Sequence, residues 1–206
     1  MRFENNVFIN CPFDDGYRPL LKALVFTLKY LDLVPHISET TSSSNIRINQ
    51  IKKFIRNCKY GIHDISRNKA MSEGELPRFN MPYELGLDIG AAEFGRSILK
   101  TKKILILDTE RYHYQKVISD ISGQDISAHN NEPQILVSKV RNWLSSNASE
   151  IVLPSANEIW IAYNQFTDDL ISTLSPTYSA QDLNEMQISD YIKFANDWVR
   201  RFKLAK

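Results

Sequence analysis

Apolar residues recur along the first 146 positions in two alternating patterns. Short apolar runs ended by polar or turn-forming residues predict strands, and apolar residues repeated every three or four positions predict amphipathic helices. The predicted strands are Asn6–Asn10, Leu33–Ile37, Lys59–Ile65, Lys102–Asp108 and, more weakly, Asp125–Ala128. The predicted helices are Tyr17–Asp32, a segment from about Ile48 to Asn57, a segment that starts near Met81, Glu110–Ser122, and Glu132–Ser146.

This alternation predicts an α/β domain over residues 1–146, a doubly wound parallel sheet of about five strands with helices on both faces. Residues 147–206 differ, because Ile159–Leu174 and Asp182–Phe202 both read as helices with an aromatic face. We expect a C-terminal α-helical extension that docks on the domain or on a partner. Its aromatic face suits either core packing or a contact in a homo-oligomer.

The composition is that of an ordinary globular protein, with 43% hydrophobic and 24% charged residues. Lysine and arginine number 25 against 24 acidic residues, a net charge of +1, which makes nucleic acid a poor first guess as partner. No apolar run is long enough to cross a membrane, and no leader-like segment stands at the start, so we expect a cytoplasmic protein. Cys11 and Cys58 are expected to be reduced thiols. No metal-ligand spacing and no glycine-rich phosphate loop occurs.

Ligands of open parallel sheets bind beyond the carboxyl ends of the strands, where loops and helix N-termini converge. The predicted elements bring a set of polar and aromatic residues to this edge. They are Asn10, Cys11, Pro12, Phe13, Asp14 and Asp15 after the first strand, Asp64, Ser66 and Arg67 after the third, Asn80, Met81, Pro82, Tyr83 and Glu84 at the next helix start, and Asp108 after the fourth.

Glu84 is the candidate catalytic residue of this set. We place it in the first turn of its helix, where the helix dipole favours the ionised carboxylate. Such a carboxylate can attack an anomeric carbon or stabilise an oxocarbenium-like transition state. Asp88, one turn later, would share its face. The alternative is that Glu84 is a favourable first-turn acid without a chemical role.

The other polar candidates have two interpretations each. Asp14 could hold a ribose hydroxyl or simply form a turn before a glycine. Asn80 could orient a substrate or cap the helix. Arg67 and Arg78 flank a long polar segment and could clamp a phosphate, or they could be solvated. His63, inside a predicted buried strand, is expected to be structural.

Three short segments suggest a family. The run Phe79–Leu87 (FNMPYELGL) resembles the glutamate motif of nucleoside 2-deoxyribosyltransferase-like proteins. Val7–Phe13 (VFINCPF) is similar to the strand-to-loop entry of that family, and His63–Ser66 (HDIS) to its aspartate-containing strand end. Toll/interleukin-1 receptor (TIR)-like domains share the same flavodoxin-like arrangement. The resemblance covers about residues 5–146, and 78–80 depart from the family's acidic or glycine-rich approach to the glutamate.

The resemblance implies an enzyme that cleaves or transfers at the N-glycosidic bond of a nucleotide, with NAD as one candidate substrate, no cofactor, and a role in bacterial antiphage defence. Glu84 would be the nucleophile or oxocarbenium stabiliser and Asp64 a contact to base or ribose. The wall of the pocket would be Phe8, Asn10, Cys11, Pro12 and Phe13, and further substrate contacts would be Asp14, Ser66, Asn80, Tyr83 and Asp88. Two alternatives stay open: a non-catalytic nucleotide-sensing module, and a protein-interaction domain without a ligand. In each case the helical tail could contact a partner protein or a second copy.

Overall fold

A five-stranded sheet forms the centre of the molecule. The computed structural model describes residues 3–38, 47–67, 78–112, 114, 118–121, 126–148 and 152–205. The strand order is β2-β1-β3-β4-β5, and every neighbouring pair is parallel. This confirms the prediction of a flavodoxin-like, doubly wound α/β fold with C-terminal helices. The strands are β1 (Asn6–Asn10), β2 (Val34–Ile37), β3 (Tyr60–Asp64), β4 (Lys103–Asp108) and β5 (Ile126–Ala128).

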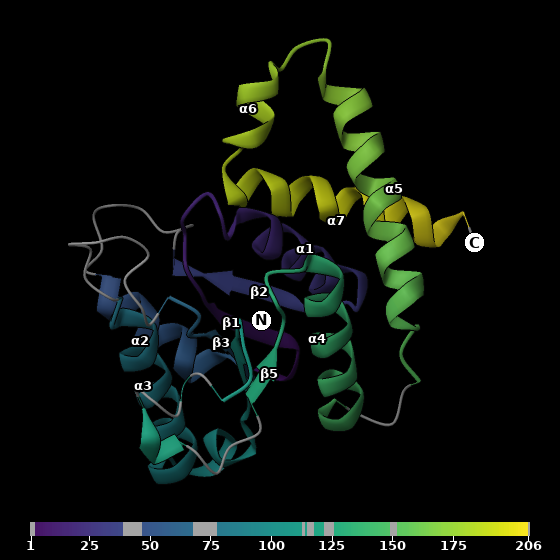
Figure 1. The fold of residues 1–206 in the computed structure, drawn as a ribbon. Helices are drawn as coiled ribbons and strands as arrows, with labels where there is room; N and C mark the ends of the chain where they lie inside the picture. The colour runs from purple at the N-terminus through teal and green to yellow at the C-terminus, as the bar shows by residue number, and fades with distance from the viewer. Residues whose placement is uncertain are drawn as a thin grey trace, which may run out of the picture.

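Helices cover both faces of the sheet, as Figure 1 shows. Val7 and Ile9 of β1 point into a large core shared with α1 and α4, whereas Phe8 between them packs against α2. This alternation of side chains is the geometry that puts successive strand residues on opposite faces. The α1 face carries α1 (Arg18–Tyr30) and α4 (Pro133–Asn147), and the opposite face carries α2 (Arg47–Asn57) and α3 (Asn80–Phe94).

The C-terminal helices pack on α1 rather than on the sheet. Phe26 of α1 stacks on Phe166 of α5 with ring centroids 5.2 Å apart and lies 5.8 Å from the ring of Trp198 in α7. All three side chains are buried, so the aromatic face of the tail serves core packing within the chain. The tail consists of α5 (Ala156–Leu174), α6 (Ala180–Asn184) and α7 (Ile188–Leu204).

The second tail helix is interrupted, which corrects the single helix expected over Asp182–Phe202. The chain leaves helical geometry between α6 and α7, and two cations of α1 bind the carbonyls freed there. Arg18 Nη1 donates to the carbonyl of Met186 at 3.1 Å, and Lys22 Nζ donates to that of Leu183 at 3.2 Å. These two hydrogen bonds satisfy backbone carbonyls at the break, and α7 then runs along α1.

The helix expected over Glu110–Ser122 is also wrong in the part of that segment which the structure describes. None of its described residues is α-helical, and Ser119–Ile121 form the 3-10 turn η5. Tyr112 has a positive φ of 63°, which a right-handed α-helix does not accommodate. The weak extended piece that follows was predicted correctly, since β5 covers Ile126–Ala128.

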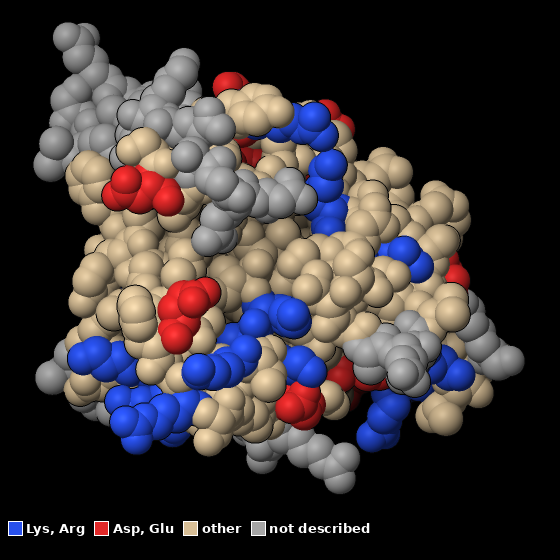
Figure 2. Space-filling view, turned by 90° about the horizontal axis from the view of Figure 1, so that it is seen from below, with Lys and Arg blue, Asp and Glu red and all other residues tan. Residues whose placement is uncertain are grey.

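The surface carries charges of both signs. Figure 2 shows lysine and arginine side chains beside acidic ones on the face seen from below, in line with the net charge of +1. Within the described ranges, no helix is long and apolar enough to cross a bilayer. Cys11 and Cys58 are buried and form no disulfide, and burial raises the pKa of Cys58 to about 12.

Candidate active site at the carboxyl edge of the sheet

Glu84 lies near the start of α3, close to the end of β1. The side-chain amide of Asn10, the last residue of β1, donates to the carbonyl of Met81 at 2.9 Å. This bond holds the first turn of α3 beside the carboxyl edge of the sheet. Only 3% of Glu84 is exposed. The candidate carboxylate therefore lies at the edge where the topology predicts ligand binding.

The pKa of Glu84 is raised in the structure, whereas a position in the first turn of a helix favours the ionised carboxylate. Glu84 is the fifth residue of α3, one place beyond the first turn, so the predicted first-turn position is wrong. Burial raises its pKa to about 7, and the Arg47 guanidinium lowers it only in part. Arg47 Nη2 lies 3.7 Å from Oε1, which is longer than a hydrogen bond. Desolvation thus outweighs both the helix dipole and the neighbouring cation.

Arg47 connects Glu84 to the loop that follows β1. It is the first residue of α2, and its guanidinium lies over the Phe13 ring, 5.6 Å from the centroid. About half of the Arg47 side chain is exposed (52%), so donors of its guanidinium face solvent. Helical periodicity places Arg47 on the solvent-facing side of its helix, so no pattern in the sequence indicates that it neighbours Glu84. We call Glu84, Arg47 and Phe13 the Glu84 cluster.

Asp88 lies one turn beyond Glu84, on the buried face of α3, and is fully buried. Its Oδ2 atom is 3.0 Å from His63 Nε2, and its Oδ1 atom is 3.0 Å from Lys102 Nζ. Burial raises the pKa of Asp88, but His63 and Lys102 together hold it below its usual value. Asp88 shares the buried face of Glu84, and its role as a substrate contact stays a prediction.

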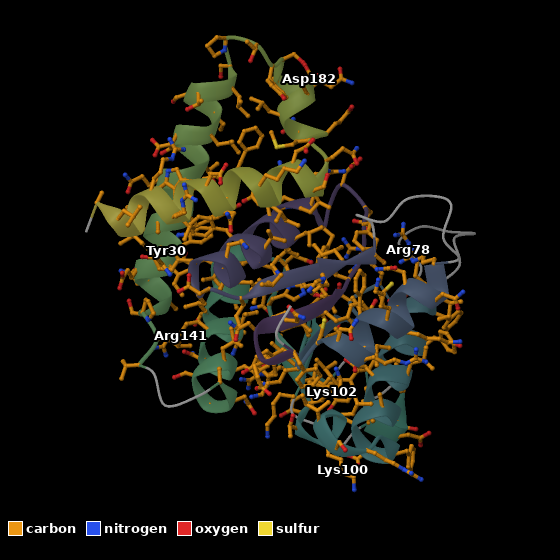
Figure 3. All side chains as sticks on the ribbon, turned by 180° about the vertical axis from the view of Figure 1, so that it is seen from behind. Tyr30, Arg78, Lys100, Lys102, Arg141 and Asp182 are labelled. Atoms are coloured by element: carbon orange, nitrogen blue, oxygen red, sulfur yellow. The ribbon has the colours of Figure 1, made fainter. Side chains whose placement is uncertain are left out.

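A series of hydrogen-bonded side chains runs from Asn10 at the edge of the sheet through His63 to the buried Asp88. Asn10 Nδ2 donates to His63 Nδ1 at 2.9 Å, so a neutral His63 carries its proton on Nε2 and donates it toward Asp88. At the other end, Lys102 Nζ also donates to the carbonyls of Ile55 and Cys58. Figure 3 shows Lys102 within the packed side chains of this region. His63 is structural, as predicted, and Asn10 is a positioning residue for α3.

Asp64 serves the opposite face of the sheet. Its Oδ2 atom accepts a hydrogen bond from the Tyr17 hydroxyl at 2.7 Å and lies 2.9 Å from His129 Nε2. Oδ1 accepts from the backbone N–H of Ser66 at 2.9 Å. Burial raises the pKa of Asp64, but His129 and Ser66 hold it low. Asp64 is 1% exposed and its carboxylate oxygens are held by these partners, and its contact to base or ribose stays a prediction.

Asp14 brings together the two arginines that flank the long polar segment. Arg67 donates from Nε and Nη2 to the two Asp14 oxygens, both at 3.1 Å, and Arg78 Nη1 lies 3.7 Å from Oδ2. Asp14 Oδ1 also accepts from the backbone of Tyr17, which fits its interpretation as a turn residue. Arg67 is buried, so it is not a solvated side chain, and the phosphate clamp stays a prediction. The intervening 68–77 lie outside the described residues.

The remaining predicted contacts divide into buried and exposed residues. Phe8 has no exposed surface and packs against Phe54 and His63, and its place in a pocket wall stays a prediction. Cys11, Pro12 and Ser66 are also buried, whereas Asn80 and Tyr83 are exposed on α3. Asn80 is the first helical residue and the N-cap is Phe79, which excludes the capping role for Asn80.

The fold and the Glu84 cluster define a flavodoxin-like α/β protein with a buried carboxylate at the carboxyl edge of its sheet. No family model matches the chain, and no curated protein matches it significantly. The described residues contain no group of three or more histidine, cysteine or acidic side chains placed to hold a metal ion.

Proposed function

We propose that this protein cleaves or transfers at the N-glycosidic bond of a nucleotide in the cytoplasm, with Glu84 as the catalytic carboxylate. The observation that carries the proposal is the desolvated Glu84 side chain beside a half-exposed arginine at the carboxyl edge of a parallel sheet. Strongly shifted carboxyl groups in such places are candidates for chemistry, because a purely structural acid gains nothing from desolvation. The resemblance of Phe79–Leu87 to a glutamate motif supports the same residue.

In the proposed reaction, the Glu84 carboxylate faces the anomeric carbon of the sugar. The bond from that carbon to the base nitrogen breaks, and its electron pair leaves with the base. The carboxylate either forms an ester with the anomeric carbon or stabilises the oxocarbenium-like transition state. Water, or a second base, then bonds to the anomeric carbon, and the proton it releases balances the departed base. Hydrolysis and transfer differ only in this last acceptor.

The neighbours of Glu84 suit a nucleotide. Arg47 offers solvent-facing donors for an anionic group such as a phosphate, and it lies on the Phe13 ring, which fixes its plane. The positive charge of Arg47 lowers the pKa of Glu84 and so favours the carboxylate form that the proposed reaction needs.

The test is base release by purified protein incubated with NAD, ATP and deoxynucleosides, followed by chromatography. Glu84→Gln should fold normally and lose base release by at least about a hundredfold, the scale of a missing nucleophile or charge stabiliser. Glu93→Gln is the matched control, because Glu93 is an exposed acid on the same helix. It should retain full activity.

Retained turnover in Glu84→Gln would overturn the catalytic assignment. Binding of a labelled nucleotide without any product would instead favour the sensing module. The role in bacterial antiphage defence stays a prediction from the resemblance.

A further inference from the structure

Helix α3 carries an unusual exposed face opposite to Glu84 and Asp88. Phe79, at its N-cap, is 67% exposed, Tyr83 is 58% exposed and Phe94 is 89% exposed. At 100° per residue these three side chains fall on one side of the helix, and Gly86 and Gly90 lie between them. We call these five residues the α3 stripe. Large aromatic side chains aligned in this way on a surface mark an interaction site.

The two glycines of the α3 stripe have no function in the packing of the chain itself. A Cβ atom at Gly86 would meet nothing within 4 Å, and one at Gly90 would meet only the edge of the Phe94 ring, at 3.9 Å. Glycine is among the least favourable residues inside a helix, so its presence here is not explained by helix stability. Glycine on an exposed helix face allows another backbone or a ring to approach closely.

We propose that the α3 stripe is a two-fold interface at which α3 packs antiparallel on α3 of a second copy of this chain. The spacing of the stripe is symmetric about the midpoint between Gly86 and Leu87. Phe79 lies as far before that point as Phe94 lies after it, and the same holds for Tyr83 and Gly90. An antiparallel pair with its axis there sets Phe79 against Phe94 of the second copy. It also sets Tyr83 into the gap at Gly90, and each contact occurs twice.

The charge and area of the α3 stripe indicate how strongly two copies would associate. The five residues of the stripe are uncharged, and the acid that borders them on α3 is the exposed Glu93. A buried aromatic side chain removes roughly 200 Å² from water, so the three exposed rings account for about 400 Å² per copy. A standard interface buries about 800 Å² per partner, so the three rings supply roughly half of that area. We therefore expect a reversible dimer whose population depends on protein concentration.

The experiment is sedimentation velocity of the full chain over a wide concentration range, with Gly90→Leu as the test variant. A leucine fills the gap that Tyr83 of the second copy would occupy, so the dimer should weaken at least about tenfold. Leucine is also a better helix former than glycine, so the variant should unfold at the same temperature as the wild type or higher. Loss of the dimer cannot then be ascribed to unfolding. Ser145→Leu, on the exposed face of α4, is the control and should dimerise like the wild type.

Cysteine cross-linking tests the register. Gly86→Cys places a thiol next to the proposed axis, and mild oxidation should give a disulfide-linked dimer, because the two native thiols are buried. Ser145→Cys should give none. A wild-type chain that sediments as a monomer at every concentration, or a Gly90→Leu dimer as stable as that of the wild type, would overturn the proposal.

Discussion

Glu84 and Asp88 lie one turn apart on the same buried face of α3, and their pKa values move in opposite directions. Burial raises the pKa of Glu84 to about 7, because Arg47 at 3.7 Å compensates only in part. Burial also raises that of Asp88, but His63 and Lys102, each 3.0 Å away, more than reverse the shift. Two acids whose environments push their pKa values apart are a pattern typical of sites that use one of them in chemistry. In this pair, Glu84 is the one placed to titrate near neutral pH.

The pH dependence of base release should report Glu84. A nucleophile or charge stabiliser acts as the carboxylate, so kcat/KM should rise with pH through a midpoint of about 7 and then level off. The measurement is kcat/KM against pH with the best nucleotide found. Arg47→Gln removes the charge that lowers this pKa, so the midpoint should move to higher pH. A rate that falls through pH 7 would instead make Glu84 a general acid.

The same pKa makes a prediction for stability. A folded-state pKa of about 7, above the usual 4.5, means that the native protein holds a proton which the unfolded chain has released. The free energy of unfolding should therefore decrease as the pH rises from about 4.5 to about 7. Glu84→Gln removes this cost, so at pH 8 it should be more stable than the wild type by up to about 3 kcal/mol, and near pH 4 about equal. Urea unfolding at the two pH values checks this, and a constant difference would contradict it.

Gly61 should tolerate no side chain. A Cβ atom there would collide with Oδ2 of Asp88 and come within 2.9 Å of His63 Nε2, so both must shift and their hydrogen bond is lost. Gly61→Ala should lower the free energy of unfolding by about 1–3 kcal/mol or more. Gly86→Ala is the contrast, because open space surrounds it, and it should gain about 0.5–1 kcal/mol when measured at dilutions where the chain is monomeric. If Gly61→Ala and Gly86→Ala change the free energy of unfolding equally, the side chains of Asp88 and His63 are not held rigidly.

Lys102 should be needed for folding through its charge. Lys102→Met leaves the buried Asp88 carboxylate with the hydrogen bond from His63 but without its lysine, which should cost about 3–5 kcal/mol. Lys100→Met, on the exposed side, should cost little. Asp88→Asn combined with Lys102→Met should recover part of the loss, because no buried charge then lacks a partner. If the effects of Asp88→Asn and Lys102→Met on the free energy of unfolding simply add, the two side chains do not interact directly.

Strong acid should weaken the ion pair between Asp88 and Lys102. The pKa of Asp88 is lowered from 3.8 in the folded protein, so the stability it contributes is present above pH 3.8 and is lost as the pH falls through the folded value. The wild type should therefore lose stability in strong acid faster than Asp88→Asn does. Thermal unfolding of both proteins over pH 2–5 tests this expectation.

Sequence patterns predicted most of the fold, because strands and helices depend on local periodicity. The alternation over residues 1–146 gave five strands that the structure contains, and the parallel sheet follows from the helical crossovers between them. Two errors came from helices. The helix expected over Glu110–Ser122 fails where Tyr112 adopts a left-handed conformation. The helix expected over Asp182–Phe202 is broken where Arg18 and Lys22 bind backbone carbonyls. Neither effect has a local signal in the sequence.

The sequence by itself determined the position of Glu84 at the carboxyl edge of the sheet, because alternating strands and helices predict a parallel sheet in which each strand leads into the start of a helix at that edge. Only the tertiary structure decided what surrounds each acid. Arg47 reaches Glu84 from another helix, Lys102 reaches Asp88 from the start of β4, and His129 reaches Asp64 from a segment 65 positions away. Burial and charge pairing depend on such long-range contacts, and they fix which carboxylate is neutralised and which is free to titrate.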